Sequence, residues 1–230
     1  MIIDAHSHVH DPVEAHLAAL DAAGVDRAVL FGTRAHPERA DDLDSLHREL
    51  SVLDTALSGE QNSIDGYRGA WADLHRALAA YPHRYLGFGS VPLDLPEHKI
   101  AALIDAEVVA RGLHGIGELT PPAGHAARIE PVLAAAQDHR LPVVIHGFAP
   151  TTAEDLHTLS RLAKRYPAVP LVISQLGGLN WMAAIGCVRD RPNMYLELST
   201  ANIIFSVRLA IRELPERVLG GNLEELLGIA

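Results

Sequence analysis

The chain has 230 residues, of which 48% are hydrophobic and only 5% aromatic, so aliphatic side chains must fill the core of one globular domain or one small α/β barrel. The formal net charge of −10 argues against nucleic acid or an anionic membrane surface as the main partner. A single cysteine excludes an intrachain disulfide, and neither a signal peptide nor a run of ~20 apolar residues is recognisable, so we expect a cytoplasmic protein.

Short apolar runs alternate with helical segments along the chain, which is typical of βα units around a parallel sheet. Several runs are continuously apolar, as expected for strands that are buried on both faces. Seven strands are expected, whereas a closed (β/α)8 barrel has eight. The expected strands cover residues 2–6, 26–32, 84–90, 113–119, 142–147, 170–176 and 193–199.

Helices are expected between these strands. Thr151 and Glu154 have the spacing of a capping box, which predicts that a helix begins just after Thr151. The expected helices cover about 37–57, 64–80, 97–111, 126–140 and 153–166, and one more follows Pro12 and ends at Gly24.

The connection over residues 33–80 is far longer than the ~2–6 residues usual between strand and helix in α/β units. Two helices within it predict a helical insertion. Such an insertion either contacts substrate as a lid or makes contacts in a homodimer, and the sequence favours neither. No repeat or linker is found, so we expect residues 1–230 to form a single domain.

His6 and His8 lie where the first apolar strand ends. Residues two apart on a strand face the same side, and the carboxyl ends of the strands form the catalytic face of a parallel barrel. Two neutral imidazoles at that position can bind Zn²⁺ or a similar divalent ion. The alternative is a pair of histidines with ordinary hydrogen bonds. His10 lies beyond the strand and is not expected to be a ligand.

Two further strands end in residues that could bind the same ion. Glu118 ends the fourth strand and His146 ends the fifth, so both are expected at the level of the histidine pair. A buried acid is rare without a partner, and a metal ion would be one, although a salt bridge is an alternative for Glu118. Together these positions predict a metal site formed by His6, His8, Glu118 and His146.

Several motifs occur in an order that resembles the amidohydrolase superfamily, in its branch of metal-dependent hydrolases with a TIM-barrel fold. They are DAHSHVH, LDAAGVDRAVLFG, HGIGEL, PVVIHG, VISQLGG and ERVLGGNLEELLGI. The resemblance spans nearly the whole chain apart from residues 33–80. It implies that His6 and His8 bind the more buried metal, that His146 is the fifth-strand ligand, and that Glu118 resembles a carboxylate bridging two metals.

The resemblance also implies a reaction. One or two divalent ions, with zinc the expected metal, would activate water for attack on a C–N or C–O acyl bond of a small molecule. Glu118 is the one candidate proton acceptor that the sequence offers. Two alternatives stay open: a decarboxylase, in which the metal is an electrophilic anchor, and a catalytically impaired barrel that only binds metal or ligand.

Two members of the family pattern are missing. Gln175 stands where the sixth strand usually ends in histidine; it is a poor zinc ligand and no acid or base, but it could bind a water or a substrate carbonyl. The eighth-strand aspartate is not found, because the chain passes from Leu219 directly into Gly220 and the final helix motif. The eighth strand is therefore absent, lies in a segment that the sequence does not include, or is replaced by closure with seven strands or by a partner chain.

Overall fold

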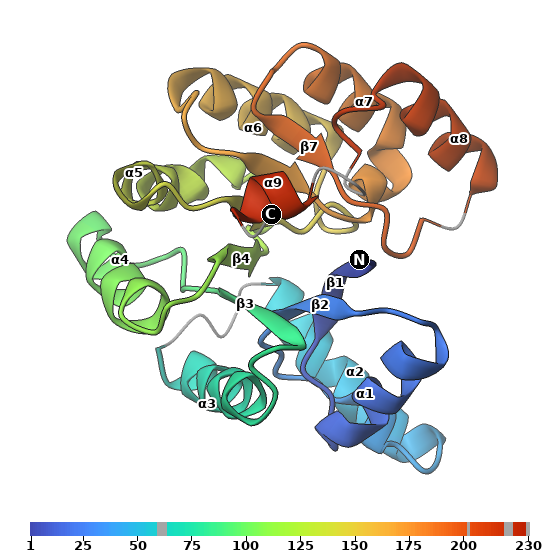
Figure 1. Ribbon diagram of the computed structural model, residues 1–230. Coiled ribbons are helices and arrows are strands. Elements are labelled where there is room, and N and C mark those ends of the chain that lie inside the picture. The colour runs from blue at the N-terminus through green and yellow to red at the C-terminus, as the bar shows by residue number, and fades with distance from the viewer. Residues whose placement is uncertain (59–63, 202, 219–222, 229–230) are drawn as a thin grey trace.

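The computed structural model describes residues 1–58, 64–201, 203–218 and 223–228. Its centre is a curved parallel sheet in which each of seven strands pairs with the next one along the chain (Figure 1). This is the expected α/β architecture, a (β/α)8-type barrel of seven strands. The strands are β1 (Ile3–His8), β2 (Arg27–Phe31), β3 (Tyr85–Gly89), β4 (Gly115–Leu119), β5 (Val143–Ile145), β6 (Leu171–Ile173) and β7 (Met194–Leu196).

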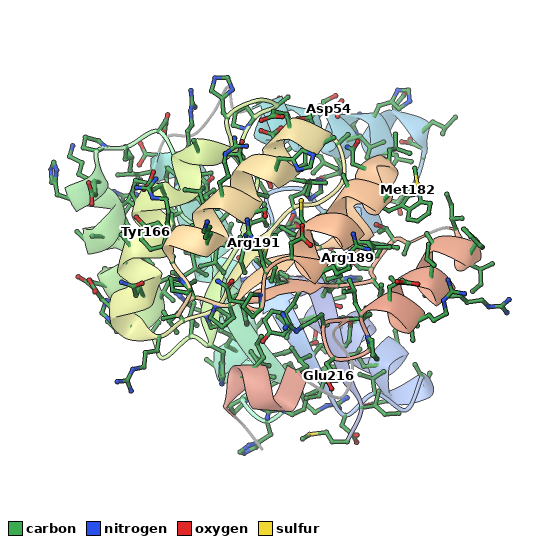
Figure 2. The ribbon with its side chains drawn as sticks, turned by 90° about the horizontal axis from the view of Figure 1, so that it is seen from above. Asp54, Tyr166, Met182, Arg189, Arg191 and Glu216 are labelled. Atoms are coloured by element: carbon green, nitrogen blue, oxygen red, sulfur yellow. The ribbon has the colours of Figure 1, made fainter. Side chains whose placement is uncertain are left out.

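Most of the helices surround the outer face of this sheet, and α6 (Ala153–Arg165), α7 (Trp181–Arg189) and α8 (Ile204–Glu213) pack in sequence along it (Figure 2). Residues 105–109 extend α4 (Glu97–Ile104) as a π-helix, and short 3₁₀ turns occur at 37–39, 126–129 and 175–180. The α-helices are α1 (Val13–Ala22), α2 (Leu43–Ser58), α3 (Ile64–Ala80), α4 (Glu97–Ile104), α5 (Glu130–His139), α6 (Ala153–Arg165), α7 (Trp181–Arg189), α8 (Ile204–Glu213) and α9 (Leu223–Leu227).

Strands β5, β6 and β7 are shorter than the apolar runs predict, with three residues each. After β6 the chain turns sharply, because Gln175 and Leu176 adopt φ values of 52° and 54° and leave the extended conformation. The strand therefore ends before its apolar run does. The turn directs the side chain of Gln175 toward the carboxyl ends of the strands.

Helix α6 begins at Ala153, as predicted, but its capping residues lie one position away from those expected. The expected pair of Thr151 and Glu154 does not cap the helix; Thr152 accepts a hydrogen bond from the backbone N–H of Asp155 at 3.1 Å. The Asp155 carboxylate in turn accepts from the backbone N–H of Thr152 at 3.0 Å, which completes a capping box.

The sheet has a small apolar interior as well as the large core beneath the helices. Side chains from β2, β3, β5 and β6 meet inside its curve, and the short helix α9 packs against them from the C-terminal part of the chain (Figure 1). Leu223 of α9 is only 3% exposed, and Leu226 and Leu227 are partly buried against the same cluster. Helix α9 thus fills space inside the sheet.

The outer edge of β7 carries the beginning of an eighth strand. Val218 forms a single parallel bridge with Leu196, whose backbone N–H donates to the carbonyl of Arg217 at 2.8 Å. Within the four described ranges, no eighth strand follows between β7 and β1. The expected discontinuity between Leu219 and Gly220 lies outside the described residues.

No helix in the described part of the chain has the length and apolarity needed to cross a membrane.

Replacing Leu223 by alanine tests the packing of α9. The leucine is buried in the inner cluster, so we expect the substitution to lower the free energy of unfolding by about 2–5 kcal/mol, measured by urea denaturation. Leu43 is 73% exposed on α2, and its replacement by alanine is the matched control, with a change of less than about 0.5 kcal/mol. Equal effects of the two substitutions would show that α9 does not contribute to the core.

Candidate metal centre

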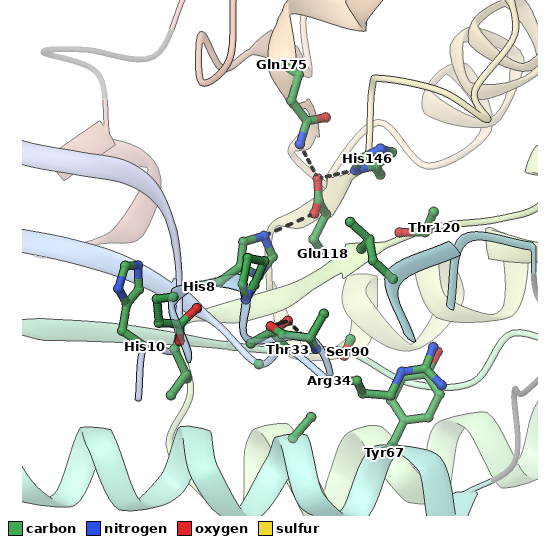
Figure 3. Close-up of a pocket in the computed structure, with 17 residues that line it drawn as sticks. His8, His10, Thr33, Arg34, Tyr67, Ser90, Glu118, Thr120, His146 and Gln175 are labelled. Atoms are coloured by element: carbon green, nitrogen blue, oxygen red, sulfur yellow. Dashed lines mark hydrogen bonds and ion pairs between the residues drawn. The ribbon is translucent and has the colours of Figure 1, made fainter. Parts of the chain in front are cut away.

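The carboxylate of Glu118 is the centre of the polar cluster at the carboxyl ends of the strands (Figure 3). Its Oε2 lies 3.6 Å from Nε2 of His6 and 3.7 Å from Nε2 of His8, while Oε1 lies 3.0 Å from Nδ1 of His146. These residues come from β1, from β4 and from the end of β5, so the sheet brings together the four side chains that the sequence predicts at one level.

His6, His8 and Glu118 fit a divalent cation. The two Nε2 atoms are 3.4 Å apart, which with the distances to Glu118 makes a nearly equilateral triangle of donor atoms. Ligands that bind zinc at about 2.0–2.2 Å, with angles between tetrahedral and trigonal, lie about 3.3–3.8 Å from one another. The three donor atoms therefore already have the mutual spacing that such an ion requires.

His146 does not belong to this triangle. Its Nδ1 faces the Glu118 carboxylate and its Nε2 lies 3.1 Å from the carbonyl oxygen of Ala149. Both ring nitrogens thus face oxygen acceptors and neither is directed at the His6–His8 pair. Its role as a metal ligand stays a prediction.

Gln175 connects several parts of the site. Its Oε1 accepts hydrogen bonds from the backbone N–H groups of Gly147, at 2.7 Å, and Phe148, at 3.2 Å. Its Nε2 donates to Oε1 of Glu118 at 2.8 Å, and the hydroxyl of Ser174 donates to the same oxygen at 2.6 Å. Gln175 therefore orients Glu118 and the loop after β5. It also lines the cavity beside the site, and substrate contact stays a prediction.

Glu197 is a residue of this cluster that the sequence prediction missed. It follows β7 directly, is 5% exposed, and places Oε2 3.3 Å from Nδ1 of His6. The hydroxyl of Ser199 donates to the same carboxylate at 2.6 Å. The available signal was an acid at the end of the seventh apolar run, the same pattern that singled out Glu118.

The charges of this cluster shift its ionisation. Burial by itself lowers the pKa of His6, but hydrogen bonds and charges of Glu118 and Glu197 outweigh it and raise that pKa to about 10. Burial by itself raises the pKa of Glu118, yet His146 and His6 bring it well below its usual value, and His6 likewise lowers the pKa of Glu197. Removal from water lowers the pKa of His8 to about 4. One histidine is therefore protonated near neutral pH and its neighbour is neutral.

A cavity of about 530 Å³ opens beside the cluster (Figure 3). His8, Glu118, His146 and Gln175 lie on one side of it, and Arg34, in the loop after β2, lies on another. The guanidinium of Arg34 is 5.2 Å from the centre of the Tyr67 ring on α3. Tyr67 and Leu53 of α2 both line the cavity, so the helices of the 33–80 segment form part of its wall.

The fold is that of an α/β barrel, and its strand ends carry a His-His-Glu cluster that could hold a divalent ion. The family model Amidohydro_2, described as amidohydrolase, matches residues 3–219. The chain belongs to the amidohydrolase family. A search of the curated proteins finds no match.

Solved structures share the fold at low sequence identity. 2,6-Dihydroxybenzoate decarboxylase from Rhizobium is 15% identical with a TM-score of 0.64, over 99% of this chain and 91% of that one. 5-Carboxyvanillate decarboxylase from Novosphingobium aromaticivorans, complexed with manganese and 4-hydroxy-3-methoxy-5-nitrobenzoic acid, is 16% identical with a TM-score of 0.60, over 95% and 84%. 4-Oxalomesaconate hydratase from Rhodopseudomonas palustris is 16% identical with a TM-score of 0.60, over 95% and 80%.

The pKa values of the histidine pair predict that metal binding releases one proton. The Nε2 proton of His6 must leave, whereas His8 is already neutral. Because a metal competes with that proton, the apparent affinity should rise about tenfold per pH unit from pH 6 to pH 9. Calorimetric titration with Mn²⁺ in two buffers of different ionisation enthalpy measures the number of protons released per ion bound.

The matched control is His125→Ala, which changes an exposed histidine outside the cluster and should leave the proton count at one. A count of zero or two in the unsubstituted protein would contradict the assignment.

Proposed function

We propose that the protein is a metal-dependent decarboxylase that acts on a small organic acid. The observation that carries this proposal is that both acids that line the cavity already have hydrogen-bond or ion-pair partners. Glu118 accepts from Ser174 and Gln175 and faces His146. Glu38 faces Nδ1 of His36 at 2.9 Å and accepts from the backbone N–H of Asp11 at 2.8 Å, and its pKa is lowered.

A carboxylate that already accepts several hydrogen bonds and has a lowered pKa is a poor proton acceptor. This distinguishes the two candidate reactions. Hydrolysis needs a base that takes a proton from the attacking water. Loss of carbon dioxide needs no such base. It needs the substrate anion to be held in place, and the electron pair of the broken C–C bond to be stabilised on the carbon atom that loses the carboxyl group. That carbon atom then takes up a proton from solvent. The two carboxylates of the cavity lining are therefore better suited to decarboxylation than to hydrolysis.

The charge of Arg34 supports an anionic substrate. Its guanidinium stacks near the Tyr67 ring at the cavity wall, and a guanidinium is the group that best matches a carboxylate in geometry. Two of the three similar structures described above are decarboxylases of aromatic acids and the third is a hydratase.

In the proposed reaction, His6, His8 and Glu118 would hold the divalent ion, which when bound supplies a positive charge that draws electrons from the substrate. Gln175 and Ser174 keep the Glu118 carboxylate oriented toward the histidine pair. Arg34 binds an anionic group of the substrate, and the ring of Tyr67 gives the cavity an apolar wall.

Hydrolysis of an acyl bond is the second candidate, and the amidohydrolase description of the matching family favours it. The products distinguish the two reactions, because decarboxylation yields carbon dioxide and hydrolysis yields a new carboxylate.

The experiment is a screen of the protein loaded with Mn²⁺ or Zn²⁺ against aromatic and unsaturated carboxylic acids, and in parallel against amides, esters and lactones. We expect carbon dioxide from an acid, detected by ¹³C NMR of a carboxyl-labelled substrate, and no release by His6→Ala. Hydrolytic turnover alone, or no turnover in any metal form, would refute the decarboxylase proposal.

Arg34→Ala tests the anchoring of the substrate anion. A charge-assisted hydrogen bond of about 1.5–3 kcal/mol is lost, so KM should rise about 10- to 150-fold with little change in kcat. Arg34→Lys should recover part of the loss because the positive charge remains. Arg161→Ala, on the exposed face of α6, is the control. A fall in kcat at constant KM would instead place Arg34 in the chemical step.

A further inference from the structure

His6 is enclosed by two carboxylates, one at each ring nitrogen. Nε2 lies 3.6 Å from Glu118 and 3.4 Å from His8, on the side of the donor triangle, while Nδ1 lies 3.3 Å from Glu197 on the opposite side. The side chains of His6 and Glu197 are 5% and 6% exposed. Water therefore has little access to the contact between them.

This arrangement specifies which nitrogen of His6 is available to a metal ion. His6 and Glu197 form an ion pair without an aligned hydrogen bond, and the buried Nδ1 has no other partner in the described structure. Because a carboxylate only accepts hydrogen bonds, we assign the proton that faces Glu197 to Nδ1. The lone pair of a metal-binding His6 is then on Nε2, the atom that already faces His8 and Glu118. Metal-bound histidines commonly donate their other N–H to a carboxylate, which fixes the orientation of the ring.

Glu197 is itself held in one position. The hydroxyl of Ser199 donates to it at 2.6 Å, the backbone N–H of Gln175 donates at 3.2 Å, and the backbone N–H of Ser199 donates as well. Glu197 does not line the cavity. It contacts His6 from behind and has no direct route to a substrate.

We propose that Glu197 is a positioning residue of the metal centre: it fixes His6 with Nδ1–H toward β7 and Nε2 toward the ion.

The contact between Glu197 and His6 also has a consequence for the fold. β1 and β7 are the two edge strands of the sheet, with no eighth strand between them in the described ranges. Glu197 connects these edges at the level of the site.

The inference rests on the metal centre proposed above but not on the reaction, so its test measures binding. Glu197→Ala should weaken Mn²⁺ binding about 10- to 100-fold, measured by calorimetry at constant pH. Glu197→Gln keeps an acceptor oxygen, so its affinity for Mn²⁺ should lie between that of the unsubstituted protein and that of Glu197→Ala. The control is Glu130→Gln on α5, which accepts from Tyr166 far from the cluster and should bind Mn²⁺ like the unsubstituted protein.

A second readout reports on His6 directly. In the Zn²⁺-loaded protein labelled with ¹⁵N-histidine, the Nδ1–H proton of His6 should give a downfield resonance, which the Glu197→Ala variant loses and the Glu130→Gln variant retains. If Glu197→Ala does not fold by circular dichroism, Ser199→Ala removes a donor that holds Glu197 and should weaken Mn²⁺ binding in the same direction.

The outcomes separate the two proposals. If the unsubstituted protein binds neither Mn²⁺ nor Zn²⁺, the metal centre itself is overturned. If it binds them and the Glu197 variants bind equally well, with the His6 resonance unchanged, the metal centre stands and the positioning role of Glu197 is overturned.

Discussion

The charge of a single buried carboxylate, that of Glu118, organises the carboxyl ends of the strands. A carboxylate removed from water costs several kcal/mol unless donors and positive charge surround it. Here the donors come from β1, from the end of β5 and from the turn after β6. Because each of these groups has to reach the same two oxygen atoms, the strands must end at one level. The cluster therefore constrains the register of the sheet as well as the chemistry of the site.

The sequence predicts the elements of the fold well, since apolar runs report burial on both faces of a strand and the polar residues at their ends report the catalytic face. His6, His8 and Glu118 are found together for this reason. The contacts of Glu197 and Gln175 are not predictable in the same way. Both depend on how β6 and β7 end, and the positive φ values after β6 that direct Gln175 toward Glu118 leave no signature in the order of residue types. The orientation of His146, toward Glu118 and Ala149, is likewise a tertiary effect.

Within the residues that the structure describes, two sets of contacts lie where a complete barrel has a strand between β7 and β1. Toward the site, Glu197 and His6 connect the two edge strands. Inside the curve, Leu223 of α9 joins the apolar cluster formed by β2, β3, β5 and β6. Val218 still pairs with Leu196 as the first residue of an eighth strand would. Apolar side chains of a helix thus fill the space inside the curve of the sheet.

The residues suited to hold a cation and the residues that shape the rest of the cavity belong to different parts of the chain, and this has an evolutionary consequence. The groups suited to hold the cation belong to the strands, whereas Arg34, Leu53 and Tyr67 belong to the segment between β2 and β3. Exchange or drift within that segment would retune which molecules the cavity admits while leaving the strand ends untouched. Changes confined to the segment between β2 and β3 would in this way give new substrate specificities while the cluster at the strand ends stays the same.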